Sequence, residues 1–99
     1  MPYIGDVLGQ SLRQPDVWPS ILEEFYVCAY QDSHGFSVRR YMVPDDKIDS
    51  VTAAVQETIT RNWYAHFVNT LAGRVYVIFM GRVFTLPLPP DDSWEVMRA

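Results

Sequence analysis

Residues 44–62 read PDDKIDSVTAAVQETITRN, and this stretch decides the fold class of the chain. Apolar residues recur in it at spacings of three and four, which is the pattern of one side of an amphipathic helix. These residues are Ile48, Val51, Val55 and Ile59. The Pro-Asp-Asp start favours a helix because acidic side chains stabilise its N-terminal end. The pattern predicts a surface helix over 45–61 that packs one stripe, with Asn62 ending it.

Segments on both sides of this helix have the composition of β-strands. Before it, the sequence predicts strands over 24–31 and 36–43, joined by a turn at 32–35. After it, the predicted strands are 63–70, 74–80 and 83–88. Gly81 and Arg82 suit a two-residue type II′ hairpin with glycine first. Pro87, Pro89 and Pro90 cannot donate to a strand ladder, so the last strand is expected to end there, at a sheet edge.

The order β-β-α-β-β-β-α predicts an α+β fold. We expect an antiparallel sheet of about five strands with the long helix packed on one face and short apolar segments at both termini. The 99 residues form a single domain, 1–99, because the chain is too short for a second core. Glycines and prolines interrupt residues 1–19, which predicts an N-terminal arm that docks on something. Residues 89–99 predict a short C-terminal helix, capped at 91–93, in which Trp94 and Met97 share a side.

The segment 20–31 has two interpretations. Ser20 and Glu23 have capping-box spacing for a brief helical turn, and Trp18, Ile21, Leu22, Phe25, Cys28 and Ala29 would form one stripe of a helix continuing to Gln31. The run FYVCAY at 25–30 is instead rich in strand formers. We prefer the strand, because the turn at 32–35 leads directly into another strand-like run.

Within the expected strands, tyrosines and phenylalanines take opposite parities, and alternate residues of a strand point to opposite faces. Phe25, Val27, Phe36, Val38, Phe67 and Phe79 fall on one parity. The other parity carries Tyr26, Tyr30, Arg39, Tyr41, Tyr64, His66 and Tyr76. We expect the helix to cover the phenylalanine face and the tyrosine face to remain half-wet, because a tyrosine pairs an apolar ring with a hydroxyl that needs a partner. The interface or ligand candidates are these seven residues together with Trp18 and Trp94.

The two arginines at 39 and 40 have separate interpretations. Arg39 lies on the tyrosine parity, where its guanidinium is expected either to stack on Tyr41 or Tyr30 or to bind a ligand carboxylate. Arg40 lies on the phenylalanine parity, where a charge is unexpected. It is predicted to extend past the helix edge or to pair with a helix carboxylate such as Glu57.

Composition argues against several classes of partner. The net charge is −4, the pI is near 4.9, and the eight basic residues are scattered and include a single lysine. Nucleic acids and anionic membranes are therefore not expected partners. The only cysteine, Cys28, excludes an intramolecular disulfide and a multi-thiolate zinc site. There is no signal-peptide pattern and no run of 18 apolar residues, so a cytoplasmic protein is expected.

No residue set names a reaction, and no cofactor or metal is expected. His66 shares parity with Cys28, and an imidazole within hydrogen-bond reach would activate that thiol. The preferred interpretation is structural, with His66 hydrogen-bonded to a tyrosine hydroxyl. His34 lacks a second ligand at metal-binding spacing. The aspartates at 45, 46 and 49 are explained as helix caps.

Three functions follow from these observations. The first is a non-enzymatic interaction module that self-associates as a homodimer through the tyrosine face or the terminal segments. The alternative is a small-molecule binding protein with an aromatic pocket for an apolar or cationic organic ligand. The third is a small enzyme that uses His66.

Overall fold

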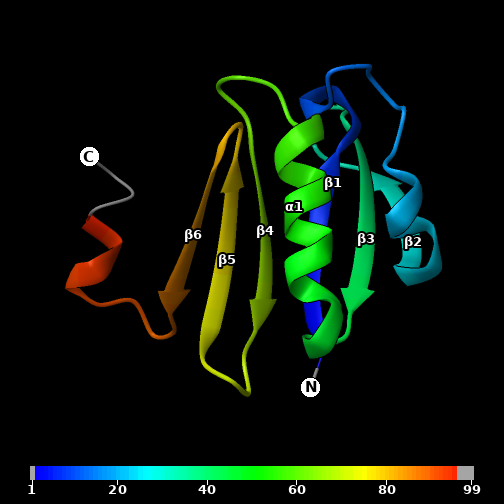
Figure 1. The fold of residues 1–99 in the computed structure, drawn as a ribbon. Helices are drawn as coiled ribbons and strands as arrows, with labels where there is room; N and C mark the ends of the chain where they lie inside the picture. Colours follow the sequence, from blue (N-terminus) through cyan, green and yellow to red (C-terminus); the bar gives the residue numbers. More distant parts are fainter. Residues whose placement is uncertain (1, 96–99) are drawn as a thin grey trace.

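The computed structural model describes residues 2–95, which form a six-stranded antiparallel sheet with one α-helix across it (Figure 1). The strand order is β2-β3-β1-β4-β5-β6. The strands are β1 (Tyr3–Leu8), β2 (Tyr26–Gln31), β3 (Ser37–Val43), β4 (Tyr64–Asn69), β5 (Arg74–Phe79) and β6 (Arg82–Pro87). The helix is α1 (Ile48–Thr58). The α+β class and the antiparallel sheet are confirmed, with six strands in place of about five.

The extra strand is β1, and it corrects the prediction of an N-terminal arm. Residues 3–8 lie in the middle of the sheet and pair with β3 on one side and β4 on the other. Every second residue of β1 is fully buried, starting with Tyr3 and ending with Val7. A 3₁₀ helix over Gly9–Ser11 follows. Residues 3–8 therefore form a central strand, and only the loop that follows them resembles an arm.

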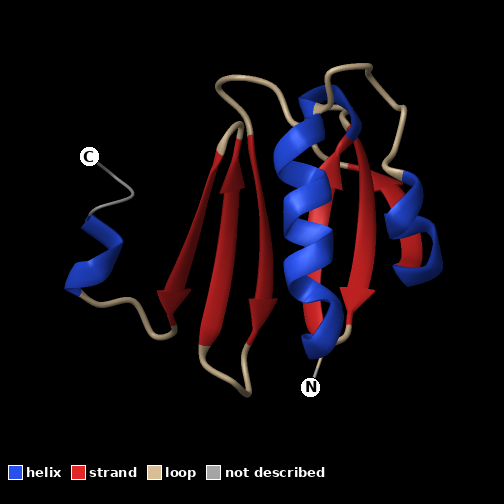
Figure 2. Cartoon of the chain, in the orientation of Figure 1, coloured by secondary structure: helices blue, strands red, loops and turns tan. Residues whose placement is uncertain are grey.

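α1 lies in front of β1, with β4 to one side and β3 to the other in this view, so the sheet has a helix side and an open side (Figures 1 and 2). A 3₁₀ turn over Asp45–Lys47 precedes α1, as the Asp-rich start predicts. The helix ends at Thr58, three residues earlier than expected, because Ile59 is extended and forms a bridge with Leu12. Asn62 then adopts a left-handed conformation, with φ of 73°, in the turn before β4.

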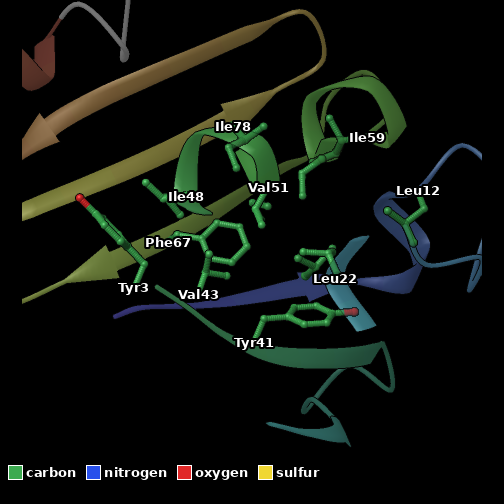
Figure 3. Close-up of a cluster of buried hydrophobic side chains, with 13 residues drawn as sticks. Tyr3, Leu12, Leu22, Tyr41, Val43, Ile48, Val51, Ile59, Phe67 and Ile78 are labelled. Atoms are coloured by element: carbon green, nitrogen blue, oxygen red, sulfur yellow. The ribbon is translucent and has the colours of Figure 1, made fainter. Parts of the chain in front are cut away.

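The core lies between α1 and the sheet, and the predicted stripe of α1 is confirmed as its centre (Figure 3). Its buried members are Tyr3, Val7, Leu12, Leu22, Tyr41, Val43, Ile48, Val51, Val55, Ile59, Ala65, Phe67 and Ile78. Burial of a large apolar side chain contributes about 1.5–3 kcal/mol. A core of this size holds the helix on the sheet without a disulfide.

The segment 20–31 combines both interpretations. Residues Ser20–Phe25 form a 3₁₀ helix, which buries Leu22, and the chain then extends as β2. The predicted continuation of a helix to Gln31 is wrong. The capping box is not formed, since no side chain caps this helix.

A two-residue loop joins β5 and β6, as predicted, but its residues and turn type differ from the prediction. Phe79 pairs with Arg82, so the loop residues are Met80 and Gly81. Gly81 is second, with φ of 76°, and the predicted type II′ turn with glycine first is wrong. At the C-terminal end, Asp92–Trp94 form a 3₁₀ helix, and the Asp91 carboxylate accepts a hydrogen bond from the Ser93 backbone as a cap. Met97 lies outside the described residues.

Candidate functional site

The pairing of the strands mixes the two aromatic sets. Phe67 lies directly opposite Tyr76, and Tyr64 lies opposite Phe79. Directly paired residues share a face of the sheet, so the prediction of one tyrosine face and one phenylalanine face is wrong. The parity within β3, β4 and β5 is as predicted, but in β2 the bulge between Tyr26 and Cys28 puts Tyr26 and Tyr30 on opposite faces. What fails is the assumption that phenylalanine parity points the same way in every strand.

The candidate residues therefore divide between two sides of the sheet. Tyr26, Arg39, Tyr41 and Tyr76 lie on the helix side, and Tyr30, Tyr64 and His66 lie on the open side. Trp18 is in the loop before the first long 3₁₀ helix, on the helix side. Trp94 is in the last 3₁₀ helix and packs against the open side.

On the helix side, Tyr41 and Tyr76 are structural. The Tyr41 side chain is fully buried, and burial raises the pKa of its hydroxyl to about 12 although the neighbouring Arg39 acts in the opposite direction. The Tyr76 ring meets the Tyr3 ring edge to face at 5.2 Å, and its hydroxyl lies 3.4 Å from the Asp49 carboxylate. Tyr41 is therefore closed to a ligand, and Tyr76 is half-buried with its hydroxyl directed at Asp49.

Arg39 binds protein groups on this side. Its guanidinium carbon lies 4.7 Å from the centre of the Trp18 ring and 5.4 Å from that of Tyr26. One guanidinium nitrogen is 3.2 Å from a Glu23 carboxylate oxygen. The stack is on different rings from those predicted, and it ties the loop carrying Trp18 to β3.

The centre of the open side carries a polar network that the sequence analysis missed. The Arg40 guanidinium donates two hydrogen bonds to the Asp6 carboxylate, at 2.8 and 3.1 Å, and the Tyr30 hydroxyl donates a third at 2.8 Å. Partial burial raises the pKa of Asp6. The hydrogen bonds from Arg40 and Tyr30 and the positive charge of Arg40 outweigh that effect, so the pKa of Asp6 is lowered overall. The predicted pairing of Arg40 with Glu57 is wrong, because Arg40 lies on the open side of the sheet and α1 packs on the other side.

His66 is exposed, and among residues 2–95 its side chain makes no hydrogen bond to a tyrosine or to the backbone. Its ring lies 6.3 Å from that of Tyr64. The structural interpretation of His66 is therefore wrong. This solvent-facing imidazole is a candidate for binding.

Cys28 and His66 do not form a catalytic pair. Register places Cys28, Arg40, Asp6 and His66 in one row across four neighbouring strands. Three strand spacings of about 4.8 Å put the ends of that row about 14 Å apart. A thiol and an imidazole at that separation cannot share a proton.

Beside this row, the open side is hollowed by an apolar groove of about 560 Å³. Its lining comes from β4, β5, the residue after β6 and the last 3₁₀ helix, and consists of Tyr64, His66, Val68, Val75, Val77, Phe79, Leu88 and Trp94. The Trp94 indole N–H donates to the Pro87 carbonyl at 2.8 Å, which fixes the ring as a wall. Three of the predicted candidates, Tyr64, His66 and Trp94, thus meet in one place.

Within residues 2–95, there is no group of three or more His, Cys, Asp or Glu side chains that could hold a metal ion. In the same part of the chain, every helix is too short or too polar to cross a bilayer. Comparison with protein-family models, with curated proteins and with solved structures finds no match to this chain.

Proposed function

We propose that this chain is a non-enzymatic interaction module that forms a homodimer by pairing strand β2 of one copy with β2 of another. The observation that carries the proposal is the state of this strand. All six residues of β2 are exposed and none carries a charge. Among residues 2–95, β2 is also the end strand of the sheet, so one side of its backbone has no strand partner within this part of the chain. Unpaired edge N–H and C=O groups bind another extended strand well.

The other edge of the sheet differs in the features that normally block such pairing. β6 begins with Arg82 and ends with Pro87, and the last 3₁₀ helix packs beside it. Charges, prolines and covering segments are the usual protection of an edge strand. β2 has one such feature, a bulge between Tyr26 and Cys28, which leaves Cys28–Gln31 regular.

The edge suits a second copy better than the open side does. A face-to-face contact through the open side would bury the Asp6–Arg40 ion pair at its centre, and burial of an ion pair carries a large desolvation penalty. Each copy carries a net charge of −4, so a contact without carboxylates minimises repulsion. A strand paired antiparallel with itself is two-fold symmetric, the commonest arrangement in homo-oligomers. The exposed Tyr26, Val27 and Tyr30 supply cross-strand pairs.

The test is sedimentation equilibrium at micromolar concentration. Wild-type protein is expected at twice the 11.4 kDa of one chain, and Ala29→Lys, which adds a charge to the β2 edge, is expected to be monomeric. Thr85→Lys makes the same addition to β6 and should leave the dimer intact. A wild-type species of 11.4 kDa alone across this range would rule out the proposal, as would a dimer insensitive to Ala29→Lys.

A cytoplasmic location is part of the proposal. Cys28 is exposed on β2, and in an oxidising compartment such a thiol would cross-link two paired copies.

A further inference from the structure

The apolar groove on the open side is separate from the β2 edge. β4 and β5, which form its floor, are separated from β2 by β3 and β1. Its properties therefore do not depend on whether the chain is a dimer. Its volume of about 560 Å³ falls within the range of small-molecule sites, about 300–1,000 Å³.

The lining of the groove defines the chemistry of an occupant. Aliphatic side chains from β4 and β5, with Leu88 after β6, form the floor, and the rings of Phe79, Tyr64 and Trp94 form walls. The Trp94 N–H is already bonded to Pro87, so the polar groups left for a ligand are the Tyr64 hydroxyl and the His66 imidazole. Among residues 2–95, no carboxylate and no guanidinium lines the groove.

We propose that this groove binds a neutral aromatic small molecule, whose ring system lies between Trp94 and Phe79 and whose single polar group meets His66 or Tyr64. An anion is disfavoured because the chain is acidic overall and the Asp6 carboxylate lies in the strand position paired with His66. A cation is disfavoured because its desolvation against the valines of the floor would lack a compensating carboxylate. Apolar contact and ring stacking supply the affinity.

The probe is N-phenyl-1-naphthylamine, a neutral dye whose fluorescence rises in an apolar site. Saturable binding of one dye per chain is expected, and its 8-sulfonate analogue should bind at least tenfold more weakly. Two competitors of the same shape then test charge. Neutral tert-butylbenzene is expected to displace the dye at a lower concentration than cationic phenyltrimethylammonium does. Equal or better binding of the sulfonate, or displacement led by the cation, would overturn the proposed ligand class.

Substitutions place the dye in the groove. Val68→Phe adds a ring to the floor and should weaken dye binding at least tenfold. Met42→Phe adds a ring to an exposed position on the same side, outside the groove, and should leave binding unchanged. Trp94→Ala removes a wall at the periphery of the fold and should also weaken binding, which keeps the test decisive if Val68→Phe unfolds. Unchanged binding in Trp94→Ala and in folded Val68→Phe would place the dye elsewhere and overturn the inference. Ala29→Lys should bind the dye as the wild type does.

Discussion

Gly5 of β1 and Phe67 of β4 lie directly opposite each other, and the Phe67 ring occupies the space where a Cβ atom of residue 5 would stand. The carbonyl oxygen of His66 borders the same space. On its other side Gly5 pairs with Tyr41, a second fully buried ring. A glycine in the central strand is therefore required, because the Phe67 ring and the His66 carbonyl oxygen fill the space that a Cβ atom would need.

Gly5→Ala is expected to destabilise the protein by about 1–3 kcal/mol, because the added methyl group forces Phe67 out of its position. Urea unfolding measures the change. Phe67→Leu alone is also destabilising, through lost packing, but in the double variant it should recover part of the cost of Gly5→Ala. Simple additivity of the two substitutions would contradict the contact.

Val55→Asp is expected to cost about 3–5 kcal/mol, because Val55 is fully buried under α1 and the new carboxylate would have no partner there. Ala53→Asp places the same group on the exposed side of the same helix and should cost less than about 1 kcal/mol. Thermal unfolding of both variants makes the comparison. Equal midpoints would show that α1 does not pack by this stripe.

The Asp6 network predicts a pH dependence of stability. The folded state lowers the pKa of Asp6, so this carboxylate contributes stability above its unfolded-state pKa of about 3.9, and the contribution is lost as the pH falls through the folded-state pKa. When the pH is lowered from neutral to below the folded-state pKa of Asp6, Asp6→Asn should therefore lose less stability than the wild type. Asp46→Asn, which removes an exposed carboxylate from the 3₁₀ turn before α1, is the control. Identical acid profiles for the wild type and Asp6→Asn would contradict the network.

Arg39→Ala is expected to cost about 1 kcal/mol, because it removes the stack on Trp18 and Tyr26. Tryptophan emission should shift to longer wavelength as Trp18 gains water. Arg39→Lys keeps the charge near Glu23 but loses the planar stack, so an intermediate effect is expected. Arg61→Ala, in the exposed turn after α1, should change neither quantity. An unaltered emission spectrum in Arg39→Ala would show that Trp18 does not depend on this stack.

His66→Gln should leave the free energy of unfolding within about 0.5 kcal/mol of the wild type, as is usual for exposed positions. Chemical unfolding provides the measurement. A loss of about 1–2 kcal/mol would instead reveal a buried hydrogen bond to this imidazole.

Local sequence was enough to predict α1, because its buried residues recur with the period of a helix and little else competes. It also located β2 to β6 to within one or two residues. β1 escaped prediction because Gly5 takes the middle of its three buried positions, so YIGDVL lacks the alternating apolar pattern of a half-buried strand. Without β1, the partner of Arg40 could not be found.

The distribution of candidates between the two sides of the sheet was beyond local sequence. Parity within a strand follows from the residue order, but the relation between strands depends on register and on which parity each strand turns toward the helix. Phe67 faces α1 and Phe79 faces away, although each takes the phenylalanine parity of its own strand. The groove could not be predicted either, because Trp94 forms one of its walls only through the position that the last 3₁₀ helix takes beside the sheet.

The central place of β1 bears on the order in which the sheet can assemble. The hairpins β2–β3 and β4–β5–β6 each join neighbouring segments of chain, whereas Ile4 pairs with Val68, 64 positions later. Pairings over such separations close large loops and slow folding. During synthesis on a ribosome, β1 is made before the other strands, but its second edge can form hydrogen bonds only after β4 has been made. Until β4 is made, the apolar residues of β1 and one of its edges are free to bind other chains. The protein is therefore most prone to aggregate during this interval.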